Sequence, residues 1–123
     1  IDIVEKKRIK ESLKKKLFIK RIFTKSEIVK SSLIKDKTSY YSKRFSAKEA
    51  FSKSIGLGIR DNLNFNDISI INDKLGKPSF VITKKIKKIV KKIFKVKSFN
   101  FFLSISDEKK YSVAYVILQK NND

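Results

Sequence analysis

The sequence contains no cysteine and no histidine. Without cysteine the chain can form neither a disulfide framework nor a thiolate metal site. Without histidine it lacks the commonest general base, metal ligand and pH-responsive group. Its chemistry must therefore rely on carboxylates, lysine, arginine, hydroxyl groups and a metal or cofactor. No apolar run approaches the roughly 20 residues of a membrane span, and no signal peptide is visible. We therefore expect a cytoplasmic protein that does not act in a membrane.

Acidic residues are scarce, since 12 Asp and Glu stand against 31 Lys and Arg, a formal net charge of +19. Such a charge is typical of proteins that bind a polyanion: nucleic acid, a membrane surface or an acidic protein. An AT-rich genome would give the same excess, because lysine, isoleucine and asparagine are abundant while arginine, glycine, alanine and proline are few. Both explanations stay open, and on either one the protein attracts anions.

The length of 123 residues, 41% of them hydrophobic, predicts a single domain over 1–123. The chain begins abruptly in the strand-like "IDIVE", so we expect a few residues to be absent upstream. Periodicity predicts a strand at 1–4, a helix at 6–16, a short helix capped by Thr24 and Glu27, a loop at 31–39 and a helix at 40–55 that ends at Gly56 and Gly58.

The second half predicts two hairpins separated by a helix. "DISIIND" and "SFVI" alternate around the turn "KLGKP", and "FNFFLSIS" and "YSVAYVILQ" alternate around "DEKK". Residues 83–97 combine an apolar stripe with many lysines, which alone is typical of a membrane-surface or nucleic-acid helix. The stripe has the width with which a helix of a globular protein packs on the core, so a core-packing helix is the preferred interpretation. The order of elements predicts an α+β domain with antiparallel sheet packed against helices.

Two carboxylates have surroundings unlike a solvated surface: Asp2 in "IDIV" and Glu49 in "SAKEAF". Carboxylates without histidine or cysteine nearby suit a hard cation such as Mg²⁺. The ordinary alternative is a strand-end aspartate and a surface glutamate paired with Lys53 one turn later. Spacing alone does not decide between them, and the Gly-x-Gly that follows is a weak phosphate-loop signal.

Five stretches occur in the order found in one enzyme family: "IDIVE" with "RI", "RIFTKSE", "KRFSAKEAFSKSIGLGI" (43–59), "FNDISIINDKLGKP" and "SISDEKKYSVAYVIL". The chain resembles holo-(acyl-carrier-protein) synthases, the small trimeric class of 4′-phosphopantetheinyl transferases, over essentially its whole length. The resemblance implies transfer of the phosphopantetheine arm of coenzyme A (CoA) to a serine of acyl carrier protein, which supports fatty acid biosynthesis.

The resemblance also implies roles for the acidic pair and its lysine. Asp2 and Glu49 match the family's Mg²⁺ ligands. Lys53, with Glu49, matches a catalytic position where the ammonium takes diphosphate charge that the metal leaves unbalanced. Such a transfer needs mainly positioning and charge neutralisation, which a chain without histidine can supply.

Further matches concern CoA. The resemblance implies CoA contacts at Arg44, Gly56, Gly58, Lys77, Pro78 and Ser104, where the glycines let backbone approach phosphate. One departure is Phe102, which stands where the family commonly has histidine. Any contact of that histidine is either lost or replaced by stacking on the phenyl ring.

The resemblance also implies a binding partner for the basic first helix. Arg8 and Arg21 match arginines that recognise the acidic carrier protein, and lysines 14–16 can assist. The family forms homotrimers with active sites between subunits, so we expect Asp2 and Glu49 on one subunit and nucleotide contacts partly on the next. The alternative function, a basic nucleic-acid-binding module, is supported by charge alone, since no stacking pattern or reading helix is recognisable. We therefore expect no nucleic-acid partner.

Overall fold

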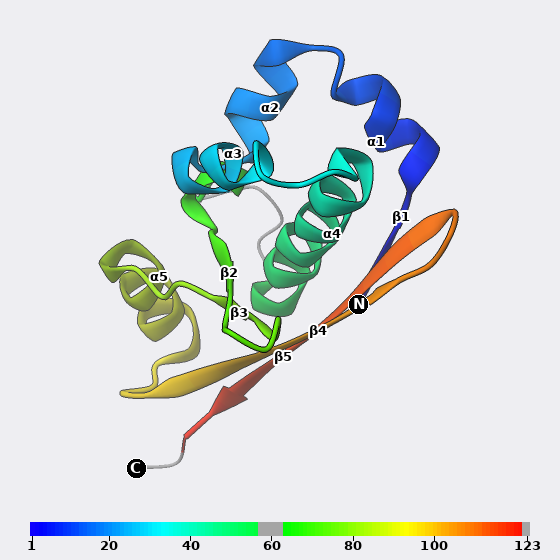
Figure 1. Ribbon diagram of the computed structural model, residues 1–123. Helices are drawn as coiled ribbons and strands as arrows, with labels where there is room; N and C mark the ends of the chain where they lie inside the picture. The colour runs from blue at the N-terminus through cyan, green and yellow to red at the C-terminus, as the bar shows by residue number, and fades with distance from the viewer. Residues whose placement is uncertain (57–62, 122–123) are drawn as a thin grey trace.

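The computed structural model of the protein describes residues 1–56 and 63–121. Figure 1 shows helices packed on one side of a long antiparallel ribbon that is extended by the N-terminal strand. In chain order the elements are β1 (Asp2–Glu5), α1 (Lys6–Ser12), α2 (Lys16–Ile22), α3 (Lys25–Ser31), α4 (Lys37–Ile55), the 3₁₀ turn η1 (Phe65–Asp67), β2 (Ile70–Asn72), β3 (Pro78–Phe80), α5 (Lys84–Phe94), β4 (Phe99–Asp107) and β5 (Tyr111–Lys120).

β5 is the central strand of a three-stranded antiparallel sheet. β1 pairs with one side of β5, where Asp2 lies opposite Ala114, and β4 pairs with the other side. β2 and β3 form a separate antiparallel hairpin. The long helix α4 runs across one face of the three-stranded sheet (Figure 1). The predicted α+β class and both predicted hairpins are confirmed.

The main hydrophobic core lies between α4, the sheet, the β2–β3 hairpin and α5. Phe51 is fully buried, with its ring centroid 4.5 Å from that of Phe101 and 4.8 Å from that of Phe80. Ile86 and Val90 attach α5 to this core and are each 1% exposed. The core-packing interpretation of this helix is therefore confirmed. Over residues 1–56 and 63–121, no helix has the length and apolar character to cross a bilayer.

A second hydrophobic cluster joins α1, α2 and α3 to the first turns of α4. Its buried members are Ile9, Phe23, Tyr40 and Tyr41, and the ring centroids of Phe23 and Tyr41 are 4.5 Å apart. The predicted capping box at the start of α3 is present in full. This cluster holds the three short helices against α4.

The ends of α4 are set by two local signals. Asp36 caps the first turn, where its Oδ1 accepts a hydrogen bond from the Ser39 N–H at 3.0 Å. Gly56 ends the helix in the left-handed conformation with φ 77°, and its N–H donates to the Lys53 carbonyl. An added Cβ at Gly56 would meet no atom of the described residues within 4 Å, so the positive φ is what favours glycine there.

Two predicted boundaries are wrong. The helix expected at 6–16 ends at Ser12, and a separate helix, α2, begins at Lys16. Leu17 is 67% exposed because Phe18, its neighbour, packs on the second cluster instead. The loop expected at 31–39 is also too long, because the Asp36 cap starts α4 at Lys37. Gly58, predicted to help end this helix, lies outside the described residues.

Candidate active site

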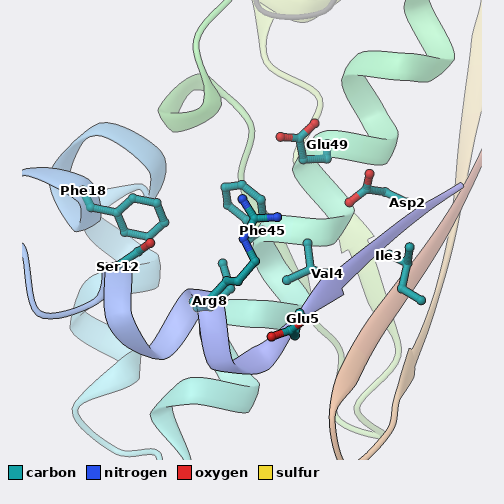
Figure 2. Close-up of a pocket in the computed structure, with 10 residues that line it drawn as sticks. Asp2, Ile3, Val4, Glu5, Arg8, Ser12, Phe18, Phe45 and Glu49 are labelled. Atoms are coloured by element: carbon teal, nitrogen blue, oxygen red, sulfur yellow. The ribbon is translucent and has the colours of Figure 1, made fainter.

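A cavity of about 380 Å³ lies between β1, α1, α2 and α4 (Figure 2). Asp2 on β1 and Glu49 on α4 stand side by side at one end of it. Phe18 and Phe45 form an aromatic wall, with ring centroids 6.1 Å apart. Arg8 extends from α1 toward Phe45 (Figure 2). The cavity therefore combines an acidic end with apolar and basic walls.

The position of Asp2 follows from the register of β1 on β5. Side chains alternate along a strand, so Asp2 faces α4 while Ile3 points away from it (Figure 2). Ala114, opposite Asp2, is fully buried, and α4 contributes the buried Ala47 and Ala50 to the same core. Because these side chains are small, helix and sheet approach closely, and a carboxylate of the strand meets a carboxylate of the helix.

Lys53 adds positive charge to this acidic end. Its Nζ donates to Asp2 Oδ1 at 2.8 Å, with the lysine side chain 57% exposed and the aspartate 11%. This hydrogen bond raises the pKa of Lys53. Burial and then the Asp2 charge raise the pKa of Glu49, against the opposing effect of Lys53. The carboxylate pair therefore favours the approach of further positive charge.

The donor set fits a hard divalent cation. Mg²⁺ takes oxygen ligands and commonly uses one or two carboxylates together with waters and substrate phosphates. In the described part of the chain, no three metal-ligating acidic, histidine or cysteine side chains gather at one place. A cation at Asp2 and Glu49 would thus take its remaining ligands from water and substrate, as suits chemistry on a phosphate group.

A second cavity, of about 620 Å³, opens on a different face of α4. Arg44 and Pro78, two predicted CoA contacts that are far apart in the sequence, both line it. Lys30 and Lys43 also line it. The two cavities share no lining residue, because neighbouring residues on a helix point about 100° apart. One chain therefore does not bring Arg44 and Pro78 together with the acidic pair.

The remaining predicted CoA contacts within the described residues are absent from the lining of both cavities. Gly56 is exposed at the end of α4, and Lys77 is exposed with its N–H donating to Asp73 Oδ1 at 2.8 Å. Ser104 is exposed on β4 opposite Tyr115. Gly58 lies outside the described residues. The CoA roles of all four residues stay predictions.

Phe102 belongs to an apolar patch on the face of the sheet turned away from α4. It lies opposite Ile117, and the two side chains are 52% and 46% exposed. Ile3 and Tyr115 share this face and are 62% and 50% exposed. We call these four residues the outer sheet patch. Its exposure is unusual, because large apolar side chains gathered on one surface commonly mark an interface.

Both arginines predicted to bind the carrier protein are exposed. Arg8 on α1 lines the first cavity. Arg21 on α2 lies in a shallow hollow with Lys15, Lys16 and the exposed Leu17. The two arginines thus belong to one basic, partly apolar region formed by the first two helices.

Sequence reasoning missed a buried ion pair. Lys48 Nζ lies 2.6 Å from Glu27 Oε1, and both side chains are at most 1% exposed. Arg44 Nε lies 3.7 Å from the other carboxylate oxygen, Oε2, with a side chain 5% exposed. The available signal was a lysine among alanines in "SAKEA", four residues after Arg44 and so on the same helix face.

Known proteins similar to this chain belong to one family. The family model described as "4′-phosphopantetheinyl transferase superfamily" matches residues 1–116. The chain belongs to this superfamily. One relative, the holo-(acyl-carrier-protein) synthase of Pelagibacter ubique (strain HTCC1062), is 72% identical over 120 residues, covering 98% of this chain and 94% of the relative. The predicted family and fold are therefore confirmed.

Solved structures of the family align over nearly the whole chain. The crystal structure of the Neisseria meningitidis holo-(acyl-carrier-protein) synthase has a TM-score of 0.84 at 36% identity and covers 97% of this chain and 94% of its own. The Bacillus anthracis enzyme, in complex with CoA (3′,5′-ADP), has a TM-score of 0.80 at 34% identity, covering 98% and 93%. The Helicobacter pylori enzyme, in complex with CoA, has a TM-score of 0.77 at 32% identity, covering 96% of each chain.

Proposed function

We propose that the protein transfers the 4′-phosphopantetheine group of CoA to a serine of apo acyl carrier protein. The products are holo acyl carrier protein and adenosine 3′,5′-bisphosphate. The observation that carries this proposal is the meeting of Asp2, Glu49 and Lys53 at one end of a cavity in a chain of the transferase family. A role in preparing carrier protein for fatty acid biosynthesis follows from that activity.

Each residue at the acidic end has a distinct task. Asp2 and Glu49 would hold Mg²⁺, which when bound supplies Lewis-acid activation and neutralises phosphate charge. Lys53 is exposed enough to turn from Asp2 toward a diphosphate, where its ammonium neutralises further charge. The serine oxygen bonds to the β-phosphorus and its proton passes to solvent, while the bond from that phosphorus to the leaving adenosine 3′,5′-bisphosphate breaks. The protein contributes positioning and electrostatics and forms no covalent intermediate in this scheme.

The separation of the two cavities supports a homotrimer with active sites between subunits. Arg44 and Pro78 lie on a different face of α4 from the acidic pair, so in this proposal CoA spans two subunits. The outer sheet patch supplies an apolar surface for such an assembly, and apolar residues are typical of homo-oligomer interfaces. Light scattering on the purified protein tests this directly. A monomer mass near 14.3 kDa at micromolar concentration would contradict it.

The basic region of α1 and α2 supports an acidic carrier protein as the partner. Arg8 lies between the first cavity and solvent, and Arg21 surrounds the exposed Leu17 together with two lysines. Charges of this kind act mainly on the encounter rate and its salt dependence. The proposal includes a cytoplasmic location, a single domain over 1–123 and no nucleic-acid partner.

Mass spectrometry tests the reaction. Apo acyl carrier protein is incubated with the protein, CoA and Mg²⁺, and the expected result is a mass gain of one phosphopantetheine per carrier protein. Addition of EDTA and the Glu49→Gln variant should each remove most of this gain while circular dichroism shows an unchanged fold, because a metal ligand is lost and no core contact. Full transfer in excess EDTA would refute the metal assignment, and no transfer by the wild type would refute the function.

A further inference from the structure

The buried charges behind the second cavity form a group with an excess of positive charge. Glu27 carries one negative charge, while Lys48 and Arg44 each carry a positive one. Burial lowers the pKa of Lys48, and the Glu27 carboxylate opposes that shift. Two cations thus share one carboxylate in an interior where uncompensated charge is costly.

Lys48 interacts more closely with the Glu27 carboxylate than Arg44 does. Its Nζ lies 2.6 Å from Glu27 Oε1 and also donates to the backbone carbonyls of Phe65 and Ile68, so its three protons are all used. The Glu27 carboxylate also accepts hydrogen bonds from the backbone N–H groups of Thr24 and Ile70, each at 3.0 Å. Its negative charge is therefore largely satisfied without Arg44.

Arg44 is fixed in place but its charge is only weakly compensated. Nε lies 3.7 Å from Glu27 Oε2 and, among residues 1–56 and 63–121, has no hydrogen-bond partner. Nη2 donates to the neutral acceptors Asn72 Oδ1 at 2.8 Å and the Ile70 carbonyl at 3.4 Å. The Tyr40 ring lies 4.2 Å from the guanidinium carbon. The guanidinium thus lies at the wall of the second cavity with positive charge left for an anion.

We propose that Lys48 and Glu27 are positioning residues for CoA binding: Lys48 occupies the Glu27 carboxylate and thereby leaves the Arg44 guanidinium free to bind a phosphate of CoA. This inference rests on the proposed function for the identity of the anion. In this proposal Lys48 and Glu27 make no direct contact with CoA. Lys48 acts only by preventing Glu27 from pairing with Arg44.

Three variants separate this role from a merely structural one. In Lys48→Met, Arg44 is the one charged partner that the described residues leave to Glu27. CoA affinity should therefore fall about ten- to a hundredfold, as for loss of a hydrogen bond to a charged group. Glu27→Gln frees Arg44 completely, so CoA affinity should stay at the wild-type level or rise although the protein loses stability. The double variant Glu27→Gln/Lys48→Met should regain wild-type CoA affinity, because the competing carboxylate is gone.

Calorimetric titration of each full-length variant with CoA, without carrier protein, gives the affinities, and thermal unfolding gives the stabilities. Lys48→Gln replaces Lys48→Met should the latter fail to fold, since it removes the same charge and keeps a donor. Ile86→Val, on the core-facing side of α5, is the control for a loss of stability that leaves the cavity intact. CoA affinity that follows stability across the series, or that stays low in the double variant, would overturn the inference.

The CoA titration and the mass-spectrometric assay together distinguish a failure of the proposed function from a failure of the proposed role of Lys48. A wild-type protein that binds CoA but leaves carrier protein unmodified in the mass-spectrometric assay contradicts the proposed function and not the charge argument. A wild type that transfers phosphopantetheine, with Lys48→Met binding CoA normally, contradicts only the role of Lys48. A wild type without affinity for CoA contradicts both.

Discussion

Replacing Lys53 with methionine is expected to increase the affinity of the acidic end for a divalent cation while lowering turnover. In the structure the Lys53 ammonium lies 2.8 Å from Asp2 Oδ1, an oxygen of one of the two carboxylates proposed to hold a cation. Cation and ammonium therefore compete for Asp2. The lysine side chain is 57% exposed, so the pair belongs to the weak class of solvent-exposed ion pairs.

The size of the effect follows from that exposure. Exposed ion pairs contribute about 0.2–1 kcal/mol, and about 1.4 kcal/mol corresponds to a tenfold change in an equilibrium constant. Cation affinity should therefore rise by roughly 1.5- to 5-fold in Lys53→Met. Turnover should fall in the same variant, because an ammonium that neutralises the diphosphate is lost.

Mn²⁺ binding followed by electron paramagnetic resonance measures the affinity in the absence of CoA. Lys85→Met is the matched control: it removes one positive charge and breaks a similar pair, Lys85 with Asp67 at 2.7 Å, away from the acidic end. Lys53→Arg keeps the charge and should bind Mn²⁺ like the wild type. Equal gains in Lys53→Met and Lys85→Met would show an effect of net charge alone, and weaker binding in Lys53→Met would refute the competition.

Three further outcomes are expected. Arg21→Glu should raise the apparent KM for carrier protein severalfold in steady-state kinetics and leave CoA affinity unchanged, because an exposed charge acts on the protein partner; an equal loss of CoA affinity would place Arg21 at the nucleotide. Burial raises the pKa of Tyr40 to about 12, so native Tyr40 keeps a proton that the unfolded chain loses above about pH 10. The stability that it contributes is therefore lost as pH rises from about 10 to about 12, and urea unfolding of Tyr40→Phe should show a shallower alkaline loss than the wild type. CoA binding with Mg²⁺ should persist at about 200 mM salt, whereas DNA binding should fall by roughly three to five decades between about 50 and 200 mM if it uses 6–10 phosphate contacts; tight, salt-resistant DNA binding without Mg²⁺-dependent CoA binding would favour the nucleic-acid alternative.

Local patterns predicted most of the elements. The alternation around "DEKK" and "KLGKP" gave both hairpins, and the Thr24 capping box gave the start of α3, because these signals act over a few residues. The break between α1 and α2 was not predictable in the same way. The apolar spacing of Ile9, Leu13 and Leu17 runs through it, and only packing on the second cluster decides that Phe18 is turned inward in place of Leu17.

The site was predictable in its residues and not in its arrangement. The resemblance to the family named Asp2, Glu49 and Lys53, and the structure brings these three together. The buried pair of Glu27 and Lys48 was hidden because its partners are 21 positions apart and Glu27 already had a sufficient explanation as a helix cap. Pairings across such separations depend on how α3 and α4 pack, which no local pattern specifies.

The buried methyl group of Ala114 has a consequence for ion choice. Ala114 lies opposite Asp2 in the sheet and is packed in the core that α4 shares, so its volume helps to set how far the carboxylates of Asp2 and Glu49 stand apart. Mg²⁺ requires ligand distances of about 2.0–2.1 Å, whereas Ca²⁺ accepts about 2.3–2.6 Å. If the pair holds a cation as proposed, position 114 adjusts the preferred ionic radius without contacting the ion. Cation preference in this fold can then change through packing volume alone, with every ligand retained.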